Sequence, residues 1–266
     1  MFKTRLLSGI LLVLIALATI ITGGDVLFAT ILMISFIGMT EVYRILEISG
    51  KALGIAGYLA CVAYYALLRF GLSEWIVMLL IAFLIVIMMI YVFTYPKYRS
   101  EQIMLAFFGL VYVAFMLSYV YQIRMLSQGA FLVWLVFLCS WGCDTCAYCV
   151  GMLFGKHKMA PKLSPKKSVE GAIGGVVGAA LLGFLYALAI NHFAQGTNAV
   201  VWQYAVICGV GGMISQIGDL AASAIKRNHD IKDYGNLIPG HGGILDRFDS
   251  VIFTAPIIYY MAILLM

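Results

Sequence analysis

The residues best suited to chemistry lie in the second half of the chain, where carboxylates fall near the ends of long apolar runs. Asp144 lies near the end of the run from Leu132 to Phe154, and Asp219 occupies a similar place in the run Gly209–Ala222. Placing an acid inside a membrane helix costs about 2.5–3.5 kcal/mol on insertion scales, and such acids usually mark a path for an ion, a proton or a substrate. The simpler alternative is an acid at a helix end that reaches water.

Asp219 begins a polar stripe, because Ser223, Lys226 and Arg227 follow it at i+4, i+7 and i+8. These spacings place an acid, a hydroxyl and two cations on one helical face. The stripe predicts a site that handles charged groups.

Two further acids, Asp246 and Asp249, are spaced i, i+3 at the start of the last apolar segment. Together with Asp219 they predict a site for a hard cation. Mg²⁺ is the natural candidate, since it takes carboxylate oxygens and leaves positions for phosphate oxygens. Acids that complement a helix dipole would explain Asp246 and Asp249, but not Asp219.

Two loops have the composition of phosphate-binding segments. The first holds Gly240, His241, Gly242 and Gly243 before a helix, where backbone N–H groups and a helix N-terminus favour an anion. The second holds Ser164, Lys166, Lys167 and Ser168. The alternatives are an ordinary glycine-rich loop and a positive cluster that attracts anionic lipid headgroups, the role expected for Lys156 and Lys158.

Two other patterns predict helix packing rather than chemistry. Cys143, Cys146 and Cys149 have metal-like spacing, but they follow an apolar helix and no fourth ligand is evident. The small-residue spacings of Gly171–Gly183 are typical of close helix contact in lipid.

The composition identifies the kind of molecule that must position these residues. Of 266 residues, 64% are hydrophobic and only 11% are charged, with a net charge of +5. A soluble domain carries roughly 25% charged residues. These values exclude a soluble enzyme and a disordered chain, and they indicate an integral membrane protein.

The apolar residues form long continuous runs, and a spanning helix needs roughly 20 such residues. Continuous rather than alternating runs favour helices over a barrel. We therefore predict an all-α, polytopic fold with about nine transmembrane helices, at residues 6–22, 26–42, 52–70, 75–95, 103–123, 129–153, 171–192, 200–222 and 248–266.

The positive charges predict the orientation of these helices. With nine spans and a cytoplasmic N-terminus, every one of the 17 Lys and Arg residues except Arg69 and Arg124 falls on the cytoplasmic side. Such asymmetry is typical of cytoplasmic segments. The C-terminus is then expected outside.

The distribution of polar residues divides the chain into two regions. Residues 1–125 have short loops and are predicted to form a scaffold of transmembrane helices. Residues 126–266 are predicted to be the catalytic region, with cytoplasmic loops 154–170 and 224–247.

Three stretches of the second region resemble the phosphatidate cytidylyltransferase (CDP-diacylglycerol synthase) family. The resemblance is carried by Ser223-Ala-Ile-Lys-Arg, Lys232-Asp233 and Pro239-Gly-His-Gly-Gly-Ile-Leu-Asp-Arg-Phe-Asp249, by Trp141-Gly-Cys-Asp-Thr-Cys-Ala-Tyr148 and by Ser164-Pro-Lys-Lys-Ser-Val-Glu-Gly171. Cys146 stands where Gly is more usual, and Ser168 where Thr is common.

The resemblance implies transfer of the cytidylyl group of CTP to phosphatidate, giving CDP-diacylglycerol and pyrophosphate. It implies Mg²⁺ as cofactor, at a site shared with a monovalent cation such as K⁺. It further implies a multi-pass protein of the inner (plasma) membrane, a homodimer whose active site faces the cytoplasm, with CTP, phosphatidate and membrane lipid as partners and no nucleic acid.

The same resemblance, combined with the residue types, gives each candidate an expected role. The predicted metal ligands are Asp219, Asp246 and Asp249. The predicted catalytic residues are Lys226, Arg227, His241, Asp246, Arg247 and Asp249. The predicted substrate-binding residues are Asp144, Ser164, Lys166, Lys167, Ser168, Ser223, Lys232, Asp233, Gly240, Gly242 and Gly243.

Two other functions fit parts of the sequence. An ion-coupled anion transporter would use intramembrane acids, but it would place them near the bilayer midplane in related repeats. A CTP-dependent lipid-alcohol kinase would attack the γ-phosphorus and would need a base for a hydroxyl nucleophile. The product released, pyrophosphate or CDP, separates the enzymes.

Overall fold

The chain folds into long helices, as its apolar runs predict. The computed structural model describes residues 2–194 and 199–266, with side chains from residue 7 onward. The charges of Lys3 and Arg5 that entered the predicted orientation lie outside the described side chains. Contacts divide the chain into two compact units, one of Met1–Ser118 with Asp233–Arg247 and the other of Tyr119–Lys232 with Phe248–Met266. The boundary falls inside two helices, so each unit is described by itself.

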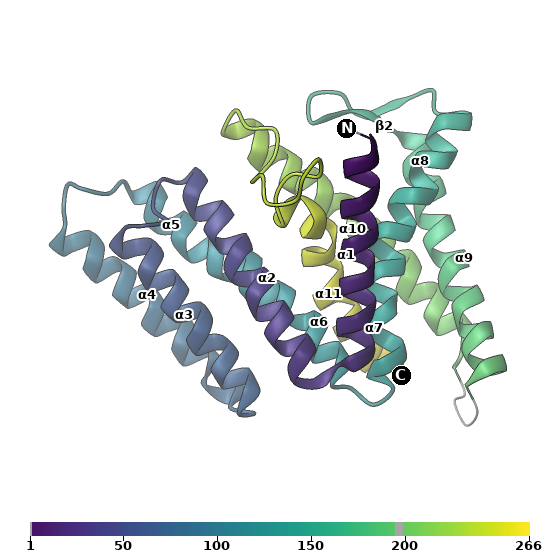
Figure 1. Cartoon of the computed structure of the whole chain (residues 1–266), viewed down its shortest axis with the longest axis horizontal. Helices are drawn as coiled ribbons and strands as arrows, with labels where there is room; N and C mark the ends of the chain where they lie inside the picture. The colour runs from purple at the N-terminus through teal and green to yellow at the C-terminus, as the bar shows by residue number, and fades with distance from the viewer. Residues whose placement is uncertain (1, 195–198) are drawn as a thin grey trace. The chain divides into compact units, whose positions relative to one another are not determined.

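The helices of the first unit follow the order of the predicted runs (Figure 1). They are α1 (Phe2–Thr22), α2 (Gly24–Ile45), α3 (Ala52–Arg69), α4 (Ile76–Phe93, preceded by the 3₁₀ turn η1, Ser73–Trp75), α5 (Ser100–Gly109), the π-helical segment η2 (Leu110–Phe115) and the first residues of α6 (Met116–Arg124).

The second unit contains the rest of α6, then α7 (Gly129–Phe137), the π-helical segment η3 (Leu138–Gly142) and α8 (Cys143–Phe154). A short antiparallel hairpin of β1 (Lys158–Ala160) and β2 (Ser164–Ser168) leads into α9 (Val169–Phe193). Two further helices, α10 (Val201–Asn228) and α11 (Leu245–Leu265), complete the chain, and α11 belongs to the second unit from Phe248 onward.

The described helices confirm an all-α, multi-pass membrane fold. Eight helical segments in the described part of the chain are long and apolar enough to cross a membrane, and α1 contributes a shorter apolar stretch, Leu7–Thr22. Each of the nine predicted runs coincides with one of these segments. In α4 only 11% of the most apolar window is buried within the protein, against 61% in Ser100–Arg124. The apolar surface of α4 is therefore suited to contact with lipid, whereas the segment Ser100–Arg124 is largely buried within the protein.

Hydrogen bonds between helices satisfy the buried hydroxyl groups of Tyr43, Tyr65 and Ser35 inside the first unit. The Tyr43 hydroxyl donates to the Ala106 carbonyl over 2.7 Å, and the Tyr65 hydroxyl donates to the Ala114 carbonyl over 3.3 Å. Ala114 lies in η2, and π-helical turns free backbone carbonyls for such partners. Ser35 completes the group through a 2.7 Å bond between its hydroxyl and that of Tyr65.

Small residues allow α8, α9 and α10 to approach closely in the second unit. A Cβ atom added to Gly175 would lie 3.0 Å from the Cys143 sulfur, and one added to Gly178 would meet Cys146. Both the glycine and the cysteine pattern therefore serve packing, as predicted. None of the six cysteines, all within the described residues, forms a disulfide.

The compact units cut across the boundary near residue 125, and the predicted division into scaffold and catalytic regions stays a prediction. Residues 233–247, which the sequence places with the C-terminal catalytic region, pack with the N-terminal helices. The physical reason is a buried carboxylate of α2, Glu41, which binds the backbone at the end of this segment.

Candidate active site

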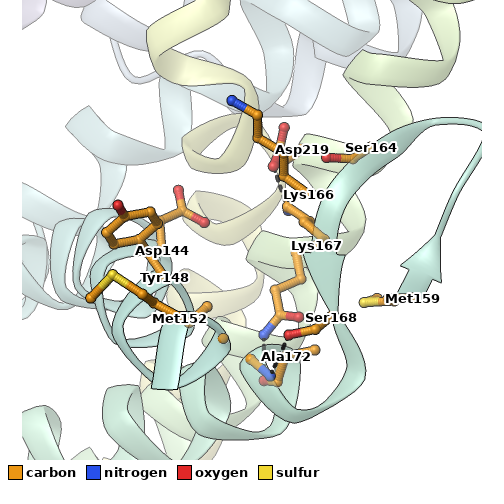
Figure 2. Close-up of a pocket in the computed structure, with 14 residues that line it drawn as sticks. Asp144, Tyr148, Met152, Met159, Ser164, Lys166, Lys167, Ser168, Ala172 and Asp219 are labelled. Atoms are coloured by element: carbon orange, nitrogen blue, oxygen red, sulfur yellow. Dashed lines mark hydrogen bonds and ion pairs between the residues drawn. The ribbon is translucent and has the colours of Figure 1, made fainter. Parts of the chain in front are cut away.

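A pocket of about 510 Å³ lies in the second unit, between the start of α9, the hairpin, α8 and α10. Its polar lining consists of Asp144, Ser164, Lys166, Lys167, Ser168, Gln216 and Asp219. Figure 2 shows Asp144, Tyr148 and Met152 along α8 on one side and the lysines with Asp219 on the other. The α8 wall thus carries one acid beside largely apolar side chains, and the other wall carries charges of both signs.

An ion pair between Lys167 and Asp219 occupies the charged wall (Figure 2). The two side chains are only 25% and 27% exposed, so water screens this pair less than a surface pair. Lys167 meets Asp219, whereas the preceding Lys166 also lines the pocket but is exposed. The sequence predicts this hairpin only as a loop, and its second strand carries the lysine that pairs with the acid.

Capping bonds fix the hairpin to α9. The Ser168 hydroxyl caps the helix by accepting the N–H of Gly171 over 3.1 Å. Glu170 accepts the N–H of Lys156 over 3.1 Å and contacts Nδ1 of His157 over 2.6 Å. In this arrangement Ser168 is buried and acts as a helix cap at the pocket wall.

Asp249 adds a third acid to this group. A Cβ atom added to Gly218 would lie 3.0 Å from the Asp249 carbonyl oxygen, so α10 and α11 approach closely at this point. The Asp249 carboxylate interacts electrostatically with Asp219 and Asp144, and with the ammonium group of Lys226. Three acids thus share the region with Lys167 and Lys226.

The buried amide of Gln216 also belongs to the pocket, and the sequence analysis did not single it out. Its Nε2 donates to the Ala172 carbonyl over 2.8 Å, and so connects α10 to the first turn of α9. The available signal was a polar amide within the apolar run Gly209–Ala222, three residues before Asp219.

The glycine-rich loop lies in the first unit and has a defined backbone conformation. Gly240 and Gly242 have positive φ values of 79° and 85°, which L side chains rarely adopt. The His241 N–H donates to the Ile238 carbonyl over 2.9 Å, and the Ile238 N–H donates to that of Gly242 over 2.9 Å. The glycines therefore form a tight turn.

Carboxylates already occupy the backbone N–H groups at the start of α11. Oδ2 of Asp246 accepts the N–H groups of Tyr234 and Gly243 over 2.8 and 2.9 Å. Glu41 accepts the next two, from Ile244 and Leu245, each over 2.9 Å. The negative charge that this helix N-terminus favours is thus supplied by the carboxylates of Asp246 and Glu41.

The N-terminal helices contribute two residues to this loop that the sequence analysis missed. Ser8 of α1 shares a 2.8 Å hydrogen bond with Nδ1 of His241 and donates to the Pro239 carbonyl over 3.1 Å. Asp144 and Asp219 were selected because each is an acid within an apolar run. Glu41 lies within the predicted run 26–42, so the same criterion applies to it.

The structure therefore separates the predicted site residues into groups. Those that line the pocket or interact at its edge are Asp144, Ser164, Lys166, Lys167, Ser168, Asp219, Lys226 and Asp249. Those that belong to the glycine-rich segment of the first unit are Asp233, Gly240, His241, Gly242, Gly243, Asp246 and Arg247. Those that lie in the second unit and outside the pocket lining are Ser223, Arg227 and Lys232.

No three His, Cys, Asp or Glu side chains in the described residues are grouped closely enough to hold a metal ion by themselves. The predicted ligand set of Asp219, Asp246 and Asp249 stays a prediction.

Comparison with known proteins identifies the chain. A family model described as the cytidylyltransferase family matches residues 3–265, nearly the whole sequence. The chain belongs to the cytidylyltransferase family. Its match includes the N-terminal helices as well as the second half that carries the recognised motifs.

Individual members of the cytidylyltransferase family are similar over almost their full length. A phosphatidate cytidylyltransferase of Staphylococcus epidermidis is 31% identical over 266 residues, covering 98% of this chain and 99% of the relative. One from Bacillus subtilis is 30% identical over 269 residues, covering 97% of each chain. One from Staphylococcus aureus is 30% identical over 266 residues, covering 98% of this chain and 99% of the relative.

Proposed function

We propose that the pocket around Lys167 and Asp219 is where this enzyme transfers the cytidylyl group of CTP to phosphatidate. The products are CDP-diacylglycerol and pyrophosphate. The family membership and the names of the full-length relatives support the reaction. The observation that carries the location is the Lys167–Asp219 ion pair on the wall of a pocket of about 510 Å³.

The chemistry requires charge neutralisation more than proton transfer. Phosphatidate presents a phosphate monoester, whose second pKa is about 6, so its attacking oxygen is largely ionised near neutral pH. This oxygen forms a bond to the α-phosphorus of CTP, and the bond from that phosphorus to the bridging oxygen breaks. Pyrophosphate leaves with the electron pair.

Two anions must approach each other in this reaction, and positioning with charge stabilisation supplies most of the catalysis of phosphoryl transfer. Lys166 and Lys167 line the pocket and are suited to bind the phosphates. Tyr148 and Met152 line the opposite wall beside Asp144, where the Tyr148 ring and the Met152 side chain suit the lipid substrate. The acyl chains can then stay in the membrane.

The proposed cofactor is Mg²⁺, and the oxygen donors of the pocket fit it. Mg²⁺ is usually bound by one or two carboxylates together with waters and substrate phosphates. Asp219 and Asp249, with Asp144 nearby, match this requirement without an all-protein cage. The bound ion would neutralise phosphate charge, and the same acids would suit a monovalent cation such as K⁺. Asp246 stays a predicted ligand, since its Oδ2 holds two backbone N–H groups.

We further propose that the enzyme lies in the plasma membrane with its N-terminus and active site on the cytoplasmic side. The support is the distribution of Lys and Arg between the nine runs. A homodimer stays a prediction of the family resemblance.

The test is an assay of purified protein in detergent with CTP, phosphatidate and Mg²⁺, with and without EDTA. We expect equal amounts of CDP-lipid and pyrophosphate, and loss of both with EDTA. Asp219→Ala should also lose both products while the protein still inserts and purifies.

Three outcomes of this assay would contradict parts of the proposal. Release of CDP instead of pyrophosphate would indicate the lipid-alcohol kinase. If neither pyrophosphate nor CDP is released, the result would indicate an anion transporter. Near-normal turnover of the Asp219→Ala variant would remove this pocket as the active site.

A further inference from the structure

A buried amide of α10, that of Gln216, lines the pocket and has no part in the reaction as described. Gln216 is only 5% exposed. It lies three residues before Asp219, about one helical turn away, and both side chains line the same pocket. The charged lining residues suit the phosphates and the cation. A neutral amide beside them suits a different part of the ligand.

Two neighbouring helices fix the orientation of this amide. Nε2 donates to the Ala172 carbonyl of α9 over 2.8 Å and to the Cys143 sulfur of α8 over 3.5 Å. A carbonyl oxygen can only accept, so the nitrogen of the amide and not its oxygen must face α9. A glutamine amide has two N–H groups and one oxygen, and these two bonds use both N–H groups. Gln216 can therefore offer a ligand in the pocket only an acceptor, Oε1.

Most groups of the two substrates cannot bind to such an acceptor. The triphosphate of CTP and the phosphate and ester groups of phosphatidate carry only acceptor oxygens once the phosphates are ionised, as they largely are near neutral pH. Two acceptors that face each other in a buried site both lose a hydrogen bond, which costs free energy. The donors lie in the nucleoside, where cytosine has a 4-amino group and the ribose has hydroxyls. Gln216 is therefore suited to the nucleoside end of CTP.

Family membership favours the base over the sugar as the partner of this amide. A cytidylyltransferase must distinguish cytosine, which carries an amino donor at position 4, from uracil, which like thymine carries an oxygen acceptor there. A fixed acceptor in a buried site pairs with the amino group and disfavours the oxygen. Lysine cannot accept, and the acids of the lining are proposed to bind the cation. Gln216 is the one amide among the described residues of the lining.

We propose that Oε1 of Gln216 accepts a hydrogen bond from the 4-amino group of cytosine and so selects CTP over UTP. This inference rests on the proposed function, because it takes the pocket as the site of CTP. UTP would place its 4-oxygen against Oε1 and leave both oxygens without a donor. In this role Gln216 determines specificity by contacting the base, and it takes no part in the transfer at phosphorus.

The test replaces Gln216 by Met, which keeps the length of the side chain but has only a weakly accepting sulfur. The matched control is Gln203→Met on the same helix. Nε2 of Gln203 also donates to a backbone carbonyl, that of Leu265, but Gln203 lies outside the pocket lining. The measurement is kcat/KM for CTP and for UTP with phosphatidate and Mg²⁺. We expect the CTP-to-UTP ratio of kcat/KM to fall at least fivefold in Gln216→Met and to stay within twofold of the unmodified enzyme in Gln203→Met.

The ratio distinguishes base recognition from a structural role alone. A variant that only folds less well loses activity with both nucleotides in equal proportion, so the ratio does not change. A second nucleotide, dCTP, keeps cytosine and lacks the 2′-hydroxyl, so it separates the base from the sugar. We expect the CTP-to-dCTP ratio to stay within twofold of normal in Gln216→Met. An unchanged CTP-to-UTP ratio, or a change confined to the CTP-to-dCTP ratio, would overturn the proposal.

A second variant, Gln216→Asn, covers the case in which Gln216→Met does not purify. Asn keeps an amide in the helix but is shorter by one methylene, which draws the oxygen back from the pocket. Its CTP-to-UTP ratio should fall at least threefold, and a ratio within twofold of normal would refute the role of Gln216. If the unmodified enzyme makes no CDP-lipid, the proposed function itself fails. CDP-lipid formation that depends on Asp219, together with an unchanged ratio in these variants, would refute only the inference about Gln216.

Discussion

At the scale of single residues, the hairpin before α9 separates lysines with different surroundings. Lys167 turns toward Asp219 and is three-quarters buried, whereas Lys158 of β1 is exposed and outside the pocket lining. Exposed charges on a membrane protein contribute mainly to attraction of anionic lipid. A buried cation beside an acid and a substrate pocket can stabilise charge that develops during the reaction.

This difference predicts unequal effects of two chemically identical substitutions. Lys167→Ala should lower kcat/KM by about 10²-fold, the range found when one charge-stabilising donor is removed from an active site. Lys158→Ala should change kcat/KM by less than about twofold, because an exposed charge contributes little. The kcat/KM of each variant is measured from the rate of CDP-lipid formation at varied CTP concentration. Equal losses in the two variants would show that only the total positive charge of the hairpin matters.

At the scale of elements, glycines determine how closely α8 and α9 pack. The glycine contacts of α9 with Cys143 and Cys146 leave no room for an added methyl group. Gly209 of α10 differs, since a Cβ atom added there would lie 3.5 Å from Ala180, an ordinary contact. The pocket depends on this packing because its lining comes from both α8 and α9.

Gly178→Ala should therefore destabilise the protein, and Gly209→Ala should not. Overpacking a close contact costs about 1–3 kcal/mol, whereas a substitution that makes only an ordinary contact changes stability by within about 0.5 kcal/mol. Thermal unfolding in detergent measures the difference as a lower melting temperature for Gly178→Ala. Equal melting temperatures in the two variants would mean that the α8–α9 contact adjusts without cost.

The helices and the hairpin differ in how well the sequence predicts them. Apolar runs of this length can only be helices in lipid, so all nine were predictable from composition alone. The hairpin was not predictable in the same way, because its Lys and Pro residues have low strand propensity. The grouping of Asp144 with Asp219 followed from their chemistry, but the contact of Glu41 with Ile244 requires knowledge of which helices meet.

At the scale of the whole molecule, the predicted arrangement of nine spans with a cytoplasmic N-terminus puts the C-terminus on the opposite side of the membrane. We expect a green fluorescent protein fused after Met266 to stay dark and an alkaline phosphatase fused there to be active, since the first folds inside the cell and the second outside. The matched control is fusion after Lys232, which should give the reverse result. A fluorescent fusion after Met266 would contradict either the number of spans or the predicted orientation.

The bond between Glu41 and Ile244 joins residues 203 positions apart, and the ribosome makes one long before the other. At roughly 5–20 residues per second, about 10–40 s pass between their synthesis. During that interval the acid of the second helix has neither of its two backbone donors. A nascent chain that stalls before residue 244 therefore lacks both of the backbone donors that this carboxylate has in the folded protein.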